Sequence, residues 1–379
     1  MNHPDRMVLG FGARGDGVAD DGGAFQRALA AGPGTVVVPA GNYLIGCVLR
    51  IGSGVRLKLD PQAKMRLADG VAKTPDDYFL TNANPVTGDE DIVVEGGFWD
   101  GNNAGNARPP GLFDYGCSGA MMHFQNVRGL RVADMQLHDA EAYHVRLTEV
   151  RGFAVERIRF SASRVRPNND GIHLGGHCED GVIRDIKGLH FGVTGDDMIA
   201  LNADDALTRT EVKGMTCGPI RNIVIEDIEA QGCHSFVRLL SVVSPIENIS
   251  ICGVRGTCEV AAINCDAARG CRVPVFDEKA PPFPDGVGFL TNITAEDFIV
   301  GKSHPNDIAL LRLETRMTNF RMTNFRRDMT GGKSPATPTL RLRHAAAREL
   351  VVNGTPAMPV AFGETLELSD AAFQELRIN

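Results

Sequence analysis

The chain has 379 residues, of which 23% are charged, and its net charge is −8. This length can bury a large core in one big domain or two ordinary ones. The acidic balance argues against a nucleic-acid binder, which would be basic, but an anionic sugar stays open because only the local field in a cleft matters for it. The absence of a run of about 18 apolar residues argues against a membrane-spanning helix.

Glycine is abundant (43 residues) and aromatic residues are scarce (6%), which favours many turns and thin, repetitive packing over a helical bundle. The nine cysteines are odd in number, scattered, and form no C-x-x-C pair. We interpret them as small buried hydrophobes rather than disulfides or metal ligands.

The N-terminal segment begins MNHPDRMVLGFGARGDG and lacks an apolar signal core, so the sequence as given predicts a cytoplasmic protein. A secreted or periplasmic location stays open if a leader has been trimmed. The stretch DDGGAFQRALAAG (20–32) predicts a short amphipathic helix, with Asp20 or Asp21 as N-cap and Gly32 as C-cap. Such a helix would cover the open end of a stack of strands.

One phrase recurs along the chain, as in NVRGLRVADMQLHD (126–139), EVRGFAVERIRFSA (149–162) and RNIVIEDIEA (221–230). Its apolar and polar residues alternate, as in a strand with one buried face. Coils of a parallel β-solenoid would align the central apolar residues of the copies, which are Val94, Val132, Val155, Ile183, Ile225, Ile251 and Ala295.

A second set of short strands lies between these phrases, each with two inward apolar residues, such as Ile172/Leu174 and Ile199/Leu201. The residue between each pair faces outward. Adjacent coils are about 4.8 Å apart. The outward residues therefore form a ladder, which we interpret as a binding groove rather than an ordinary solvated face: His123, Arg146, His173, Ala200, Arg238, Asn264 and Arg312.

Three aspartates occupy equivalent corners of two successive coils, Asp170 in NNDGIHLGG and Asp196 with Asp197 in TGDDMIALN. Carboxylates this close raise the pKa of at least one of them, so identical residues become an acid and a base. Hydrolysis of a glycosidic bond with inversion needs that division. A turn-capping role would explain one Asp–Gly, but the three acids beside a ladder of His and Arg favour catalysis.

The segment Asn169-Asp170-Gly171, followed by Gly195-Asp196-Asp197, resembles the aspartate signatures of glycoside hydrolase family 28, the polygalacturonases. The opening FGARGDGVADDGGAFQRAL resembles the start of pectate-lyase-like β-helix proteins. The resemblance covers roughly residues 8 to 320. It implies a single-stranded right-handed parallel β-helix, with Asp196 as general acid, Asp170 and Asp197 holding the nucleophilic water, and no metal or organic cofactor.

After the aspartates this sequence departs from the family pattern, in which Gly-His-Gly and then Arg-Ile-Lys usually follow. Here His234 and Arg238 stand for the histidine and arginine, but Leu240 stands where the lysine would be. That lysine grips a uronate, so polygalacturonate itself is in doubt, unless Arg146 or Arg312 compensates. The remaining candidate substrate-binding residues are His173, His144, Asn169 and Asn202.

Smaller features stay open at this stage. Trp99 fits a sugar platform or a core position, and Tyr143 with His144 fits a sugar subsite or ordinary strand packing. Asp204 and Asp205 offer oxygen ligands for Ca²⁺, although two acids are weak support. Long loops at 101–119 and 266–286 favour exo or short-oligosaccharide action over endo action.

We expect one domain over residues 1–379, with a cap at about 8–33 and degenerate final coils at about 330–379. The leading hypothesis is an inverting glycosidase acting on a uronic-acid-containing or related glycan, with no nucleic acid or membrane as partner. A polysaccharide lyase and a non-catalytic glycan-binding or structural β-helix are the alternatives. Sugar identity, linkage and oligomeric state stay open.

Overall fold

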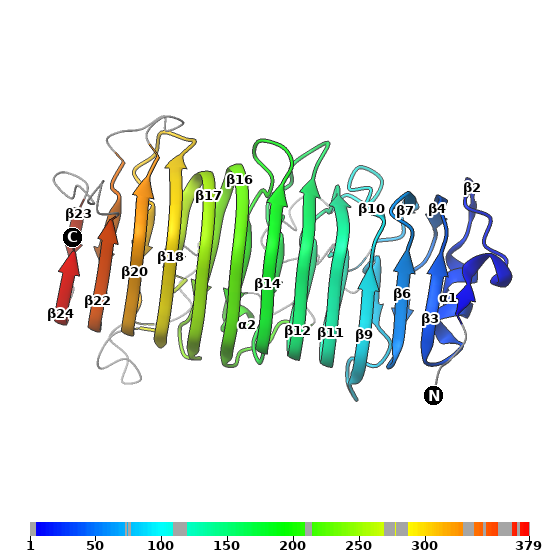
Figure 1. The fold of residues 1–379 in the computed structure, drawn as a ribbon, viewed down its shortest axis with the longest axis horizontal. Coiled ribbons are helices and arrows are strands. Elements are labelled where there is room, and N and C mark those ends of the chain that lie inside the picture. Colours follow the sequence, from blue (N-terminus) through cyan, green and yellow to red (C-terminus); the bar gives the residue numbers. More distant parts are fainter. Residues whose placement is uncertain are drawn as a thin grey trace.

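The computed structural model is an elongated stack of parallel strands, with the two termini at opposite ends (Figure 1). All the strands join one parallel sheet network in which each coil pairs with the next. The structure describes residues 5–72, 74, 77–108, 120–208, 214–268, 277, 287–328, 337–343, 346–354, 366–369 and 372–378.

The N-terminal third contains short strands and one longer helix. Its elements are β1 (Arg6–Met7), the 3-10 helix η1 (Val8–Phe11), β2 (Asp16–Asp20), α1 (Gly22–Ala30), β3 (Gly34–Val38), β4 (Gly41–Ile45), β5 (Leu49–Ile51), β6 (Val55–Leu59), β7 (Ala63–Leu67), β8 (Leu80–Asn82), β9 (Asp89–Glu95) and β10 (Phe98–Asp100).

The middle and C-terminal parts contain longer strands that bend around corners. They are β11 (Met122–His138), β12 (Val145–Ser161), β13 (Ile172–Leu174), β14 (Glu179–Gly188), β15 (Asp197–Asn202), the short helix α2 (Asp205–Thr208), β16 (Ile220–Leu240), β17 (Ile246–Cys265), β18 (Leu290–Lys302), β19 (Leu311–Leu313), β20 (Met317–Arg327), β21 (Leu340–Arg343), β22 (Ala346–Gly354), β23 (Leu366–Ser369) and β24 (Ala372–Ile378). The last four strands lie in the segment where the sequence predicts degenerate final coils.

The predicted register is confirmed at every position that the repeated phrase marked. Val132 pairs with both Val94 and Val155, and the series continues without a slip to Ala295. The inward pairs of the second strand set also align, and Ile172, Leu174, Ile199 and Leu201 are fully buried. Each such side chain contributes about 1.5–3 kcal/mol on burial, so this regular core is the main source of stability.

The corners between strands explain which residues recur in the phrase. Asn222, Asn248, Asn292 and Asn319 all adopt left-handed backbone conformations, with φ between 54° and 59°. Asparagine tolerates this region better than other residues with a side chain. The side-chain Nδ2 of each of the last three donates to the Oδ1 of the asparagine before it, at 3.0 to 3.1 Å, which forms an asparagine ladder along the stack.

Helix α1 lies at the N-terminal end of the stack and buries Phe25, Ala28 and Leu29 (Figure 1). Its N-cap is Asp21 as expected, but that side chain does not cap the helix. The Asp21 carboxylate instead accepts from the backbone N–H groups of Arg14 and Gly15, at 2.7 and 3.1 Å. The C-cap is Ala31, so the predicted Gly32 cap was wrong by one residue.

Three other expectations can be compared with the structure. All seven described cysteines are free and four of them are buried, which agrees with their interpretation as small hydrophobes. Trp99 is a core residue: it is fully buried, and its Nε1 donates to the carbonyl oxygen of Gly96 at 3.0 Å. Neither α1 nor α2, the α-helices in the described part of the chain, has the length and hydropathy required to cross a membrane. The tips of both long loops, 109–119 and most of 269–286, lie outside the described residues.

Candidate active site

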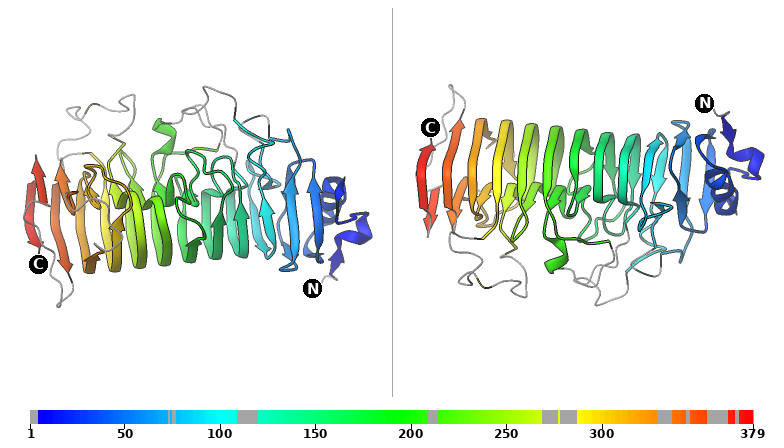
Figure 2. Two further views of the ribbon diagram at one scale, coloured as in Figure 1. Left: turned by 90° about the horizontal axis from the view of Figure 1, so that it is seen from above. Right: turned by 90° about the horizontal axis from the view of Figure 1, so that it is seen from below.

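The ladder of outward residues exists in the predicted register. Neighbouring coils pair His123 with Arg146, Arg146 with His173, His173 with Ala200, Ala200 with Arg238, Arg238 with Asn264, and Asn264 with Arg312. Helix α2 and the longer described connections between strands all project from one side of the stack (Figure 2). The opposite side of the stack is an even row of strands.

The first half of this ladder is covered, which corrects the expectation of an open groove along its whole length. His123, Arg146 and His173 are 2%, 0% and 0% exposed. The Nε of Arg146 donates to the His123 ring at 3.0 Å, and its guanidinium stacks near the rings of Tyr78 and Tyr143. Arg146 therefore packs inside the molecule rather than facing a groove.

The three aspartates meet as the sequence predicted. The N–H of Gly171 donates to the carbonyl oxygen of Asp197 at 2.9 Å, which places Asp170 beside the Asp196–Asp197 pair on the next coil. The glycines of the two motifs are required by close packing. A Cβ at Gly171 would lie 2.5 Å from the carbonyl oxygen of Met198, and one at Gly195 would overlap that of Arg166.

His234 completes the cluster from β16. Its Nδ1 lies 3.3 Å from Asp196 and 3.9 Å from Asp197. The pairing of β16 with β17 is irregular between Ala230 and Ser235, and such bulges re-aim side chains. The side chains of His234 and Asp196 are 36% and 20% exposed, so this part of the cluster is accessible to a ligand.

The two neighbouring acids differ in their protonation. Burial, together with the charges of Asp197 and Asp170, raises the pKa of Asp196 to about 7. Burial also acts to raise the pKa of Asp197, but hydrogen bonding and the positive charges of His234 and Arg238 outweigh it and leave this pKa below its ordinary value. Near neutral pH, Asp197 is therefore the ionised member of the pair, and Asp196 holds a proton far more readily than an ordinary aspartate does.

His173 bridges two carboxylates. Its Nδ1 lies 2.6 Å from Asp170 Oδ2, and its Nε2 hydrogen-bonds to Asp205. Burial acts to lower the pKa of His173, but the two acids outweigh it and raise the pKa to about 9. His173 is thus a buried cation that fixes Asp170. Asp205 was absent from the predicted site, and no spacing in the sequence links it to His173.

Asp204 is held by the main chain. Its Oδ2 accepts hydrogen bonds from the N–H groups of Val242, Val243 and Ser244, at 2.6, 2.8 and 2.8 Å. Because Asp204 binds these amides and Asp205 binds His173, the structure gives both acids tasks other than the Ca²⁺ site that the sequence left open.

Three further predicted binding residues are buried in structural contacts. The Asn169 side-chain amide donates to the carbonyl oxygens of Ala140 and Ala142, at 3.0 and 2.6 Å. His144 bonds the Asp170 carbonyl through Nδ1, and burial lowers its pKa to about 4. Asn202 donates to Asp205 at 3.2 Å. These side chains hold the chain around the acid cluster. They are buried in these contacts, so the prediction that they contact a sugar is not supported.

The second half of the ladder is more open. The side chains of Arg238 and Arg312 are 17% and 18% exposed, and both pair with Asp266. Leu240 is 2% exposed and packs in a small apolar cluster with Val242 and Val287. The position where the resemblance placed a lysine is therefore an apolar packing position.

A metal ion also has potential ligands here, because one ligand atom from each of Asp196, Asp197 and His234 lies within 4.8 Å of the others. The carboxylates Asp197 and Asp196 outweigh burial and raise the pKa of His234 to about 9. A ring that is protonated at neutral pH is a poor metal ligand, since coordination requires its lone pair. In its protonated form the ring is an ion-pair partner of the two acids.

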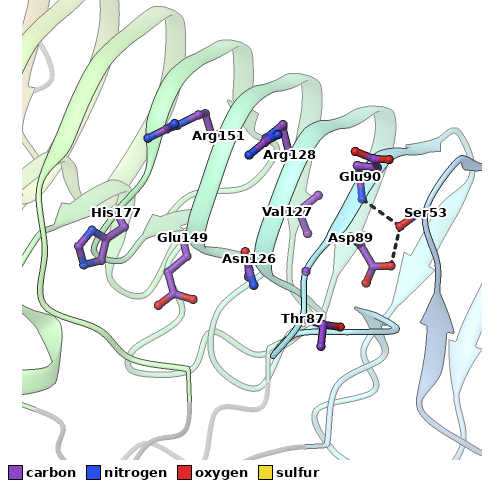
Figure 3. A pocket seen from close by; sticks show the side chains of 11 residues that line it. Ser53, Thr87, Asp89, Glu90, Asn126, Val127, Arg128, Glu149, Arg151 and His177 are labelled. Atoms are coloured by element: carbon purple, nitrogen blue, oxygen red, sulfur yellow. Dashed lines mark hydrogen bonds between the residues drawn. The ribbon is translucent and has the colours of Figure 1, made fainter.

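A polar cavity of about 520 Å³ lies elsewhere, at a corner of the coils (Figure 3). Figure 3 shows Arg128 and Arg151 on one side of it and Glu149 and His177 on another. Asp89 in its wall is held by Ser53, and Arg151 pairs with Glu179 at 2.7 Å. None of the predicted site residues is among those lining it, so this cavity is separate from the acid cluster.

Known proteins are similar to this chain in sequence and in fold. Residues 6–105 match the family model described as rhamnogalacturonase A/epimerase, pectate lyase-like. A probable polygalacturonase of Arabidopsis thaliana is 28% identical over 269 residues, which are 68% of this chain and 53% of that protein. The chain is thus similar in sequence to polygalacturonases over about two thirds of its length. It spans about half the length of the curated polygalacturonases that it matches.

Solved structures are similar to this chain in fold. The family 28 exopolygalacturonase of Yersinia enterocolitica has a TM-score of 0.61 at 16% identity, covering 98% of this chain and 75% of that one. The surface protein and adhesin PfbA of Streptococcus pneumoniae also scores 0.61, at 13% identity, with 98% and 97% covered. The fold therefore accommodates both enzymes and adhesins, and only the site distinguishes them.

Proposed function

We propose that this chain is a glycoside hydrolase that cleaves an O-glycosidic bond, by inversion, in a uronic-acid-containing or related glycan. The observation that supports it is the contrast between adjacent Asp196 and Asp197, one with a pKa raised to about 7 and one with a lowered pKa. This chemistry requires one general acid and one general base, and the two different pKa values would give the two aspartates these roles. The polygalacturonase names of the relatives favour the same class.

In this proposal Asp196 donates its proton to the glycosidic oxygen as the bond from that oxygen to C1 breaks. Water attacks C1 from the opposite face, and its proton passes to the carboxylates Asp197 and Asp170. His173 is a positioning residue, because its Nδ1 holds Asp170 Oδ2 in place. His234, 3.3 Å from Asp196, lies beside the departing oxygen and favours the carboxylate that forms there.

The spacing of the acids does not by itself support inversion. One carboxylate oxygen of Asp196 lies within 4.8 Å of one of Asp197, whereas inverting enzymes typically separate their two carboxyl groups by about 6.5–9.5 Å. Inversion therefore rests on the family resemblance and on Asp170 sharing the water. Proton NMR during the first turnovers tests it, since a product of unchanged anomeric configuration would show retention.

A screen of aryl glycosides and uronic oligosaccharides tests the function, with the Asp196→Asn variant as blank. Hydrolysis yields new reducing ends that the variant does not release. A lyase would instead give the ultraviolet absorbance of an unsaturated uronide. A non-catalytic glycan-binding module would give identical traces for both proteins, and that result would reject the proposal.

We also propose the finer features of the architecture. The stack is a single-stranded right-handed β-helix, α1 caps its N-terminal end, and residues 1–379 form one domain. The buried core supports the last point, because one cluster extends from Val8 to Leu342. Limited proteolysis tests it, since a second domain would be released as a stable fragment.

A further inference from the structure

One aromatic side chain is exposed in the connection that leads to the acid pair. Phe191 lies between β14 and β15, just ahead of Asp196, and it is 68% exposed. Among the large hydrophobic side chains that are exposed in the described part of the chain, it is the only aromatic one. A single exposed apolar side chain is common on protein surfaces, so its surroundings decide whether it has a role.

The ring of Phe191 is seated on the next coil, close to His234. A Cβ on Gly232 would lie 2.5, 2.6 and 2.8 Å from Cζ, Cε2 and Cε1 of the ring. These three carbons form the far edge of the ring, so the Gly232 backbone supports that edge. The N–H of Gly192 also donates to the carbonyl oxygen of Gln231 at 2.8 Å, which ties the segment that carries Phe191 to the same coil.

The Phe191 ring lies on the same side of β16 as the imidazole of His234. Cys233 is fully buried and points into the coil, so Gly232 and His234 on either side of it point outward. His234 Nδ1 lies 3.3 Å from Asp196. Two residues of extended chain span at most about 7 Å, so the aromatic ring and the acid border one edge of the site. A sugar chain that extends from Asp196 past His234 reaches the ring.

Two further apolar side chains are exposed beside the acid. Val165 is 41% exposed on the preceding coil, and its Cγ1 lies 2.7 Å from where a Cβ on Gly195 would stand. Leu189 is 46% exposed in the same connection as Phe191. We call Val165, Leu189 and Phe191 the apolar rim. They are three of the eight large hydrophobic side chains exposed in the described residues, so the corners around Asp196 are enriched in them.

An aromatic face beside carboxylates matches the two kinds of surface on a sugar ring. The hydroxyl groups of a sugar bond to polar side chains, whereas the C–H groups on one face form an apolar patch with a small positive charge. The face of an aromatic ring is electrostatically negative, so such C–H groups stack on it. Because the Phe191 ring is supported at its far edge and is 68% exposed, a face is available for this contact.

We propose that Phe191 is a substrate-binding residue, on whose ring a sugar unit close to the cleaved bond stacks through its C–H groups. This inference rests on the proposed function and adds an aromatic subsite to that same site. Val165 and Leu189 extend the apolar surface along the rim. The ligand is a glycan chain rather than a single sugar, because the ring lies beyond His234 as seen from Asp196.

Oligogalacturonides of increasing length test the proposal, by calorimetric titration into the Asp196→Asn variant, in which turnover is removed. We expect the affinity to rise about tenfold at one step of the series, where the added unit reaches the ring. Phe191→Ala in the same background should abolish that step. Equal affinities of the folded Phe191→Ala protein and its parent for the longest oligomer would overturn the proposal, as would a parent that binds none of them.

Matched substitutions separate stacking from simple apolar contact. Phe191→Tyr keeps an aromatic face and should keep the step in affinity, whereas Phe191→Leu is apolar but not flat and should lose most of it. Val86→Ala truncates an apolar side chain that is 90% exposed between β8 and β9, and it should leave every affinity unchanged. Circular dichroism verifies that each variant folds. Full affinity in Phe191→Leu would contradict the stacking assignment.

Self-association is the competing use of the apolar rim. Sedimentation of the wild type and of Phe191→Ala tests it, since a rim that binds glycan leaves the oligomeric state of the two proteins the same. A wild-type dimer that the substitution converts to monomers would assign the rim to a contact between copies and overturn the proposal.

The outcome is separable from that of the proposed function. If the wild type releases reducing ends that Asp196→Asn does not, while the affinities do not depend on Phe191, the chain is a hydrolase and only the aromatic subsite fails. If the two proteins release reducing ends equally, the hydrolase proposal fails, and a step in affinity that depends on Phe191 would still show glycan binding at the rim.

Discussion

Two Asp-Asp pairs lie close together in the sequence, Asp196-Asp197 and Asp204-Asp205, and the fold uses them differently. Asp196 is partly exposed beside two other acids and His234. Asp204 is fully buried and bound by three backbone amides, and Asp205 is buried against His173. The first pair keeps a transferable proton near neutral pH, and the second pair holds the structure around it.

The comparison shows that the reactivity of a carboxyl group depends on which groups surround it. A carboxylate that accepts several N–H groups is a stabilised anion, whereas one that faces other carboxylates retains its proton more strongly. The two pairs are chemically identical in the sequence. Their difference therefore gives direct tests, in which the first pair should affect rate and the second pair stability or positioning.

Asp196→Asn should give the largest effect. The amide cannot donate the proton to the leaving group, so we expect kcat to fall by about 10³-fold, within the range of general acid catalysis. Reducing-end assays on the best substrate from the screen measure it. The fold should persist, because the side chain is partly exposed, and a similar loss from an unfolded variant would not support the assignment.

Asp204→Ala should mainly affect stability. The substitution leaves three backbone N–H groups, two of them buried, without their acceptor, so we expect the free energy of unfolding to fall by about 3–5 kcal/mol. Urea denaturation measures it, and kcat per folded molecule should change little. A variant that is as stable as the wild type but inactive would show that the roles of the two pairs are not separate.

Asp205→Asn should act through His173. Removing one of the two flanking carboxylates should lower the pKa of His173 from about 9, which NMR titration of the ring can follow. In the wild type, the stabilisation from His173 is complete below its unfolded pKa of about 6.5 and is lost as the pH rises through about 9. In the variant, the stabilisation from His173 should therefore be lost at a lower pH than in the wild type.

The effect of Asp205→Asn on rate should be about tenfold, since Asp170 is less firmly held. Asp5→Asn, a neutralised acid at the exposed N-terminal end, is the matched control. A loss of rate with an unchanged His173 titration would contradict the positioning role.

The pH dependence should separate the two states of Asp196. Activity should fall as the pH rises through about 7, because the donor loses its proton. Between its unfolded pKa of 3.8 and about 7, the folded state binds this proton and the unfolded state does not, so the free energy of unfolding falls as pH rises. Asp196→Asn should therefore be more stable than the wild type at pH about 8 and no more stable at pH about 4.

Chelation should have the smallest effect. We expect that EDTA leaves the rate unchanged, because the protonated His234 disfavours metal coordination by the first pair. A rate abolished by EDTA and restored by a divalent cation would contradict the proton-transfer role of the first pair, since Asp196 and Asp197 would then be metal ligands.

Much of this arrangement could be predicted from the sequence. The alternation of apolar and polar residues fixed the stacking of Val132 on Val155 and of Ile172 on Ile199, and with it the meeting of Asp170 and Asp197. Strand periodicity gives such pairings because a slip of one residue would turn every apolar side chain outward.

The sequence could not predict which outward-pointing side chains are covered by other segments, or which hydrogen-bond partners they have. Periodicity shows that Arg146 and His173 point out of the coil, but not that other segments cover them. The bulge that aims His234 and the diversion of Asp21 to Arg14 and Gly15 depend on tertiary contacts that no local pattern encodes. The link between His173 and Asp205 is of the same kind.

The asparagine ladder gives the molecule a direction. Each amide from Asn319 back to Asn222 donates toward the N-terminal end, and Asn222 Nδ2 finally donates to Asp180 Oδ1 at 2.8 Å. The chain of aligned dipoles thus terminates on a carboxylate, which suits hydrogen bonds that polarise one another. Whole coils can be gained or lost along such a chain without reversing it, whereas a single-residue deletion within a coil would interrupt it. The coil is therefore the unit whose insertion or removal would leave the ladder in register.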